Sequence, residues 1–472
     1  MKNRENIILI IVGILVTVFI TFIFLESLKF GLIILIFLLF LLLLLKSRKL
    51  SFNDIPLLLL LFSVLLPPIR FESTPYVRPE LILILITWPL FLLGRIAKGE
   101  SIKLRWTPTH KWFFIFGASI LISILWVWIF QNFSPTPRDF FEIAKLIEYF
   151  LIFAFVTNLN TKRENFRKYY IFTICIFLIA TVFAFIQRWN LFPGFNESFI
   201  GYVAPKHLDE WLAHRRIVGT VGNPNEFGIL MVMASSLAIS GTLWIKKIGL
   251  KILSFLSFAI FSFTITLTLS RSALIVFLIN LLFILFLKYT RRFGLKGKAK
   301  LVFLIFPTII ILGLIILQIA PPKFIRRAIS GLGIETDVSF QNRLNIWKEN
   351  LEIWKQSPIF GWGPGKDAMT TIVDNEWLLL LRRYGIVGVV IFIFWFGRFY
   401  SGLSRIQRKE KTNLYLEIFS IFLQASLIGI AIYMIPAAFY HSLQLMPILM
   451  TLLGLVYSQY KTKRTKNSIL AT

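Results

Sequence analysis

Apolar runs long enough to cross a lipid bilayer recur along the whole of this chain. A transmembrane α-helix needs about 20 consecutive, mostly apolar residues, and runs of that kind follow one another here. Hydrophobic residues make up 57% of the 472 residues, and the mean hydropathy is +0.76. Both values lie outside the range of ordinary soluble domains. The sequence therefore predicts an all-α integral membrane protein.

Counting these runs predicts about fourteen transmembrane helices in a single polytopic membrane domain over residues 1–472. The first run lacks a small-residue cleavage site and a second follows at once, so we interpret it as a retained helix and not as a signal peptide. The single cysteine, Cys175, falls inside a span, so no internal disulfide is possible. The predicted spans are residues 7–25, 29–45, 54–69, 80–97, 112–130, 139–157, 169–187, 226–245, 251–269, 271–288, 301–320, 377–399, 413–435 and 441–459.

The charges agree with this topology. The chain has 51 Lys and Arg residues against 23 Asp and Glu residues, a formal net charge of +28. With the amino terminus inside, the inner segments carry most of the excess and the outer segments are near balance, as the positive-inside rule requires. We therefore expect both termini to be cytoplasmic, and we attribute the charge to topology and to attraction for anionic membrane lipids. A nucleic-acid partner is excluded, because it would need a basic soluble face.

Two outer loops, residues 188–225 and 321–376, are much longer than the others. Long ordered loops in a compact bundle are usually functional. Both carry arginines on the side where the positive-inside rule depletes them, and sites for phosphate and other anions need such arginines. Within the second loop, residues 340–355 place apolar side chains at helical spacing, which predicts an amphipathic helix in the outer membrane interface.

The end of the first loop combines arginines with a predicted helix start. Arg215 and Arg216 precede Gly219 and Gly222, which permit a tight turn, and Asn223-Pro224-Asn225 is a capping signal for a helix that begins near residue 226. A helix amino terminus beside arginines is suited to bind an anion. The alternative is an ordinary turn from a loop into a helix.

Arg271 lies in the string Ser270-Arg271-Ser272, between two apolar runs at the outer boundary of the membrane. An arginine in that position often extends to lipid phosphate. Alternatively it faces the interior of the bundle, where an ionisable side chain is a candidate functional group.

Acidic residues stand out in two other places. Asp374 and Glu376 directly precede a span, where a helix cap is the expectation for Glu376, while a cap and a chemical role are both open for Asp374. Glu142, Lys145 and Glu148 recur every three residues near one face of the sixth span. We expect an ion cluster inside the bundle, with a groove for a lipid carrier as the alternative.

Four strings resemble motifs of the O-antigen ligase and polymerase family, in the family's order and all on the outer side. They cover roughly residues 210–390. They are Arg216-Ile217-Val218-Gly219 with Gly222-Asn223-Pro224-Asn225; Ser270-Arg271-Ser272; Arg343 and Trp347 with Pro358-Ile359-Phe360-Gly361-Trp362-Gly363-Pro364-Gly365; and Asp374-Asn375 with Leu381 and Tyr384-Gly385-Ile386-Val387-Gly388.

The resemblance implies a glycosyltransferase-C-like helical bundle in the bacterial inner membrane. It implies a metal-independent glycosyltransferase that moves glycan from a polyprenyl-pyrophosphate carrier to a glycan or lipid acceptor on the extracytoplasmic face, with no cofactor. Fixed guanidinium groups stabilise the negative charge that grows on the departing pyrophosphate. By motif match, the catalytic residues are Asp374, Arg216 and Arg271. The residues implied to bind pyrophosphate or substrate are Arg215, Arg216, Asn223, Asn225, Arg271, Arg343 and Asn375.

One departure from the family bears on the reaction. Ligases of the family have a His-Asn pair, whose histidine is the expected base, where this chain has Asp374-Asn375. The base role therefore passes to Asp374, with His207, His214 and His441 as outer-side histidines that are able to substitute for it. The missing histidine favours a polymerase of undecaprenyl-pyrophosphate-linked repeat units. The alternatives are an O-antigen ligase that acts on lipid A-core or protein and, in a different class, a flippase for lipid-linked oligosaccharide.

Overall fold

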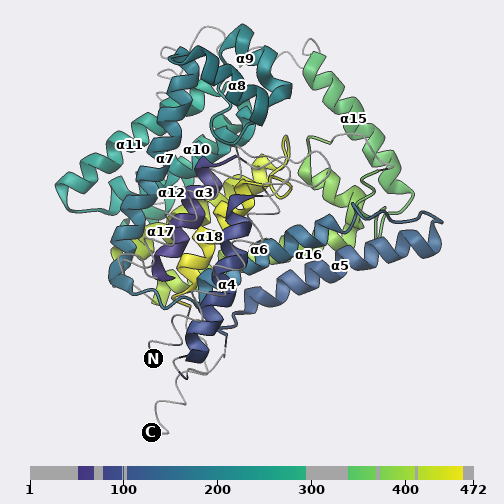
Figure 1. Cartoon of the computed structure of the whole chain (residues 1–472), viewed down its shortest axis with the longest axis horizontal. Coiled ribbons are helices and arrows are strands. Elements are labelled where there is room, and N and C mark those ends of the chain that lie inside the picture. The colour runs from purple at the N-terminus through teal and green to yellow at the C-terminus, as the bar shows by residue number, and fades with distance from the viewer. Residues whose placement is uncertain are drawn as a thin grey trace.

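A computed structural model of the chain (Figure 1) describes residues 52–67, 78–97, 99, 104–293, 338–367, 373–409 and 413–460. Every regular element in these ranges is a helix. The helices are η1 (Phe52–Asp54), α3 (Ile55–Leu65), α4 (Pro79–Ala97), α5 (Pro108–Phe130), α6 (Phe141–Asn158), η2 (Arg163–Asn165), α7 (Phe166–Trp189), α8 (Pro193–Val203), η3 (Pro205–His207), α9 (Leu208–His214), α10 (Pro224–Trp244), α11 (Ile248–Leu267), α12 (Arg271–Phe293), α15 (Val338–Lys355), α16 (Glu376–Lys409), α17 (Leu414–Tyr433) and α18 (Leu445–Tyr457).

Eight helices of the described ranges are long and apolar enough to cross a membrane, which makes the chain a multi-pass membrane protein. They are α4, α5, α7 with η2, α10, α11, α12, α16 and α17. A helix overlaps every predicted span within the described residues, while the spans predicted at 7–25, 29–45 and 301–320 lie outside them. Helix α6 overlaps the predicted span 139–157 but is not among the eight, because three of its 18 residues are charged.

Helices α10 and α17 form the centre of the bundle. In their most apolar windows 78% and 72% of residues are buried, against 28% for α4 and for α11. Helix α10 packs against α11, α12 and α17, and α16 packs along α5 (Figure 1). Small residues line α10, and they let neighbouring backbones approach closely in a membrane bundle. Among them are Ala234, Ser235, Ser236, Ala238 and Ser240.

Both long outer loops contain helices. The loop predicted at 188–225 holds α8 and α9, which lie together at one end of α7 and α10 (Figure 1). Helices of one to three turns are too short to give the apolar pattern of a membrane span, so the sequence predicts only a loop over this segment. The helix predicted at 340–355 is present as α15, and its location in the membrane interface stays a prediction.

Candidate functional site

The turn before α10 is built from two glycines and a helix cap, as predicted. The Asn223 side chain accepts hydrogen bonds from the backbone N–H groups of Asn225 (2.9 Å) and Glu226 (3.4 Å), so it caps α10. Gly219 and Gly222 have φ angles of 60° and 78°, a region that disfavours residues with a Cβ. A Cβ on Gly219 would also lie 2.2 Å from the ring of Phe227. The turn therefore depends on glycine both conformationally and sterically.

Gln187, near the end of α7, holds this turn from the other side. Its side-chain amide donates to the Gly219 carbonyl (3.0 Å) and accepts from the Gly219 N–H (2.9 Å). Gln187 is fully buried, and it satisfies a backbone donor and acceptor that would otherwise cost free energy in the interior. No sequence pattern singled out this residue.

Arg216 joins three separate segments. Its Nε donates to the Thr268 carbonyl (2.8 Å), and its Nη2 donates to the Asn225 side chain (3.0 Å). Its Nη1 lies 2.9 Å and 3.1 Å from the two carboxylate oxygens of Glu210, on α9. Only 7% of Arg216 is exposed. The guanidinium therefore ties α9, the first turn of α10 and the end of α11 into one structure.

Arg271 begins α12 just beyond the Thr268 carbonyl that Arg216 binds. The turn between α11 and α12 is tight: the Ser270 N–H donates to the Thr268 hydroxyl (3.3 Å), and the Ser270 hydroxyl caps the Ala273 N–H (3.4 Å). This turn packs on α10, since a Cβ on Gly228 would lie 2.7 Å from the Ala273 Cβ. The structure thus brings the two predicted arginine motifs to one end of α10, with Arg271 partly exposed.

Arg215 points to a different partner from Arg216. Its guanidinium lies 4.4 Å from the centre of the Trp211 ring, a cation–π contact, and its backbone is left-handed with a φ of 51°. Its carbonyl accepts a hydrogen bond from Arg188 (3.1 Å). These contacts give Arg215 a role in shaping the α9-to-α10 turn; contact with a substrate stays a prediction.

Arg343, on α15, reaches the other predicted segment. Its Nε lies 3.4 Å from an Asp374 carboxylate oxygen, and its Nη1 lies 3.5 Å from the Pro436 carbonyl. The two side chains of this ion pair are 32% and 48% exposed, so the pair is open to a ligand. Asn375 is the cap of α16, because its side chain accepts from the Leu378 N–H (3.0 Å).

Glu376 does not have the capping role expected for it. It is fully buried and reaches the segment between α17 and α18, where it accepts from the Phe439 N–H (2.8 Å) and contacts Nδ1 of His441. The cap belongs to Asn375 because its side chain is shorter and sits one residue earlier, in position to reach the free N–H groups of the first turn.

The predicted ion cluster on α6 forms around Glu142. Its carboxylate, buried completely, lies 2.9 Å from Lys145, 2.8 Å from Lys366 and 3.3 Å from Arg383. Glu148 belongs to a second pair, with Arg78. Glu142 and Lys145 thus form the expected cluster, but with partners from the second long loop and α16.

The outer histidines have partners as well. His207 Nδ1 lies 3.5 Å from Glu210. His441 lies between Glu376 on Nδ1 and Arg383 on Nε2, the latter at 2.6 Å. The side chain of His214 is outside the described residues. His207 and His441 thus make side-chain pairings in this structure, and their ability to replace Asp374 as the base stays a prediction.

One buried hydroxyl lies near two groups of predicted site residues. The first is the Arg216 group, which is Arg216 with its partners Glu210, Asn225 and Thr268, and the second is the Arg343–Asp374 pair. Tyr433, the last residue of α17, is fully buried. Its hydroxyl lies in the electrostatic field of Glu226 and Arg216, and then of Arg343 and Asp374. The segment after Tyr433 contacts both sides, through the Pro436 carbonyl on Arg343 and the Ser442 hydroxyl on Glu226, next to Asn225. Predicted site residues thus come from the turns before α10 and α16 and from α15, and the segment after α17 contacts both groups.

The glycine turn at 361–365 packs onto a break in α16. Gly385 has φ 64° and ψ −169°, which are not helical values. A Cβ there would lie 2.1 Å from the Ile359 carbonyl oxygen, and a Cβ on Gly361 would lie 2.5 Å from the Arg383 backbone. The Ile386 N–H donates to the Pro358 carbonyl (2.9 Å). Two of the resemblance motifs thus contact each other through their glycines.

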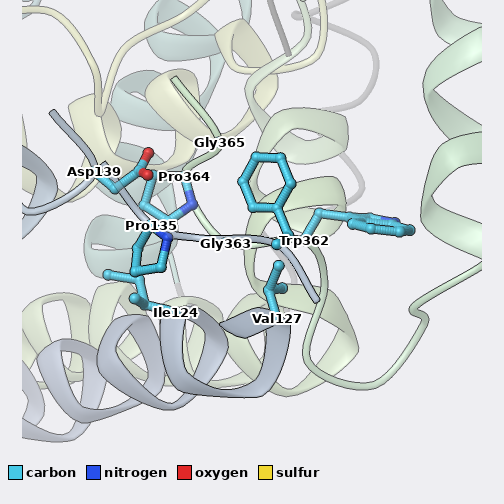
Figure 2. A pocket seen from close by; sticks show the side chains of 9 residues that line it. Ile124, Val127, Pro135, Asp139, Trp362, Gly363, Pro364 and Gly365 are labelled. Carbon is cyan, nitrogen blue, oxygen red and sulfur yellow. The ribbon is translucent and has the colours of Figure 1, made fainter. Parts of the chain in front are cut away.

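A pocket lies beside this turn, between α5 and Asp139 (Figure 2). Trp362 and Gly363 line it, and the Gly363 N–H donates to Ser123 of α5 (3.0 Å). The Asp139 carboxylate accepts from the Lys366 N–H (2.9 Å). These polar groups are hydrogen-bonded to one another, so they stabilise the turn. The walls that the pocket offers to a ligand are therefore mostly apolar. In the described part of the chain, no group of three or more His, Cys, Asp or Glu side chains is placed to hold a metal ion.

Comparison with known proteins gives one family match. Residues 256–393 match a family model described as O-antigen ligase. The match covers the second part of α11, all of α12 and α15 and the first part of α16, and so includes Arg271, Arg343 and Asp374. No curated protein matches the chain.

Proposed function

We propose that this chain is a membrane glycosyltransferase that polymerises glycan repeat units carried on a polyprenyl pyrophosphate. The match of residues 256–393 to the O-antigen ligase model supports its assignment to the O-antigen ligase and polymerase family. The observation that carries the proposal is the set of hydrogen bonds made by Arg216. They link Asn225 of one arginine motif to Thr268, which lies three residues before Arg271 of the other.

In this proposal Arg216 and Arg271 bind the pyrophosphate of the donor. Cleavage of the glycosyl–phosphate bond leaves negative charge on the departing pyrophosphate, and guanidinium groups fixed in a partly dry site stabilise that charge without reorganising. The amino terminus of α10, capped by Asn223, adds the favourable end of a helix dipole to the same place. The charge is then matched by the chain's own side chains, without a metal ion.

Asp374, Arg343 and Asn375 form the acceptor side of the proposed site. The two side chains of the Arg343–Asp374 pair are 32% and 48% exposed, and Arg343 contacts the segment after α17 that also holds Ser442, the partner of Glu226. Its carboxylate and guanidinium are able to bind the hydroxyls of an acceptor sugar. Asp374 stands where the ligases that this chain resembles have their expected base, so it is one candidate to take the proton of the attacking hydroxyl.

Product analysis tests this function. Purified protein in liposomes is given a polyprenyl-pyrophosphate oligosaccharide, with and without a lipid or peptide acceptor, and the products are resolved by mass. Glycans of increasing length support the polymerase, and one transfer to the added acceptor supports a ligase, the activity named in the matched family description. Movement of the donor across the bilayer without transfer indicates a flippase and contradicts the proposal.

The metal-free mechanism has its own test. Activity retained in the presence of a strong chelator agrees with it, and activity that is lost with chelator and restored by a divalent cation contradicts it. The same liposomes locate the site, which the proposal assigns to the extracytoplasmic face of a bacterial inner membrane with both termini cytoplasmic. A cysteine introduced at the exposed Glu197, on α8, should then react with an impermeant thiol reagent from the outside only.

A further inference from the structure

The proposed transfer needs a group to take the proton of the acceptor hydroxyl, and two of the obvious candidates are already engaged. Asp374 faces the guanidinium of Arg343 at 3.4 Å. His441 has Glu376 on one ring nitrogen and Arg383 on the other. The Arg343 guanidinium stabilises the charged form of Asp374 and so weakens it as a base, and among the described residues both ring nitrogens of His441 already have partners. A third candidate is another carboxyl in the same region.

Glu226 is that carboxyl. It lies in the first turn of α10, next to Asn225, whose side chain accepts the hydrogen bond from Arg216. Its side chain is partly buried, and the Ser442 hydroxyl donates to one of its oxygens. Among the described residues no Lys or Arg forms an ion pair with it, unlike Asp374 and Glu142. Glu226 is thus a carboxyl at the amino terminus of α10, next to a partner of Arg216, and among the described residues it has no cation to match it.

The surroundings of Glu226 point to a ligand. Tyr433 is completely buried, and its hydroxyl has no hydrogen-bond partner among the described residues. A buried hydroxyl without a partner is unfavourable unless something binds to it. Helix α17, which ends at Tyr433, packs along α10, and Ser442 from the segment after it binds Glu226. At this end of α10 a donor sugar attached to its pyrophosphate would bridge the Glu226 carboxyl and the Arg216 guanidinium.

We infer that Glu226 is the proton acceptor of the transfer, a role that rests on the proposed function. The acceptor oxygen forms a bond to the anomeric carbon of the donor sugar while the bond from that carbon to the pyrophosphate oxygen breaks. The electron pair of the broken bond leaves with the polyprenyl pyrophosphate, beside Arg216. The proton of the acceptor hydroxyl passes to a carboxylate oxygen of Glu226, which is neutral until it loses the proton to water.

Steady-state kinetics of four variants in liposomes test this role. In Glu226→Gln, kcat should fall by about 10²- to 10⁴-fold, the usual contribution of a positioned base. The KM for the donor should stay within about threefold of the wild-type value, because donor binding is kept. Glu226→Asp keeps a carboxylate and should recover part of kcat. Asp374→Asn should lose less kcat than Glu226→Gln, and Glu197→Gln, an exposed outer-side control on α8, should behave as wild type.

The outcomes separate the two levels of the proposal. If Glu226→Gln keeps kcat within about threefold, or loses donor affinity as much as kcat, Glu226 is not the base. A wild-type protein that transfers no sugar contradicts the proposed function itself. Should Glu226→Gln fail to fold, Glu226→Asp decides alone: withdrawing the carboxylate by one methylene should lower kcat at least about tenfold at constant donor KM, and an unchanged kcat overturns the assignment.

Discussion

Replacing Arg216 separates its structural role from its chemical one. In Arg216→Ala the Glu210 carboxylate, the Asn225 side chain and the Thr268 carbonyl all lose their donor. Breaking a buried ion pair costs about 3–5 kcal/mol, and an unsatisfied carbonyl costs about 1–3 kcal/mol. Glu210 is 26% exposed, so water replaces part of the lost interaction. We expect a net loss of unfolding free energy of about 3 kcal/mol.

The same substitution should remove charge stabilisation from the departing pyrophosphate. One fixed donor to a developing oxyanion is worth about 2.7–4 kcal/mol, or a loss of about 10²- to 10³-fold in kcat. Arg216→Lys keeps the charge but not the planar fork that spans Thr268, Glu210 and Asn225 at once. We expect Arg216→Lys to fold better than Arg216→Ala and still to lose at least about tenfold in kcat.

The assay combines thermal unfolding in detergent with transfer kinetics in liposomes, measured on the same preparations. Both variants are assayed well below their midpoints of unfolding, so that a loss of kcat reports on folded protein. The reasoning is refuted if Arg216→Ala is destabilised as expected but transfers glycan at the wild-type rate, because Arg216 would then act only as a structural link.

Three further perturbations follow from the contacts. Gly219→Ala should lower the midpoint of thermal unfolding, since its Cβ meets the Phe227 ring at 2.2 Å and its φ is 60°; an unchanged midpoint would mean that this turn adapts freely. Glu142→Gln leaves three cations around a neutral side chain, and we expect the free energy of unfolding to fall by about 3–5 kcal/mol. An unchanged free energy in chemical unfolding would contradict this expectation. A double-mutant cycle on Arg343→Ala and Asp374→Ala should give a coupling energy below about 1 kcal/mol that falls with salt, because both side chains are substantially exposed; a larger, salt-independent coupling would contradict this.

Features set by local chemistry could be predicted from the sequence. The spans follow from the length of apolar runs, and helices overlap each of them in the described residues. Asn223 caps α10 because a short side-chain oxygen before Pro-Asn reaches the free N–H groups of the first turn. The turn at 361–365 needs glycines because three of its residues have positive φ.

Partners brought together by tertiary packing could not be predicted. Glu210 lies in a helix of only seven residues with no apolar pattern that would predict it, yet it forms an ion pair with Arg216. His441 and Glu376 are 65 positions apart, and no periodicity connects them. Gln187 looked like an ordinary polar residue at the end of a span. In each case the contact depends on how α9, α10 and the segment after α17 pack, which a single sequence does not specify.

The central claim is that Arg216 and Arg271, from separate segments, bind one pyrophosphate. A cryo-electron microscopy map of the protein in nanodiscs with a polyprenyl pyrophosphate tests it most directly. The account predicts density for the two phosphates between the guanidinium groups of Arg216 and Arg271, at the amino terminus of α10. Phosphate density at the cations around Glu142 instead, with none beside Arg216, would contradict it.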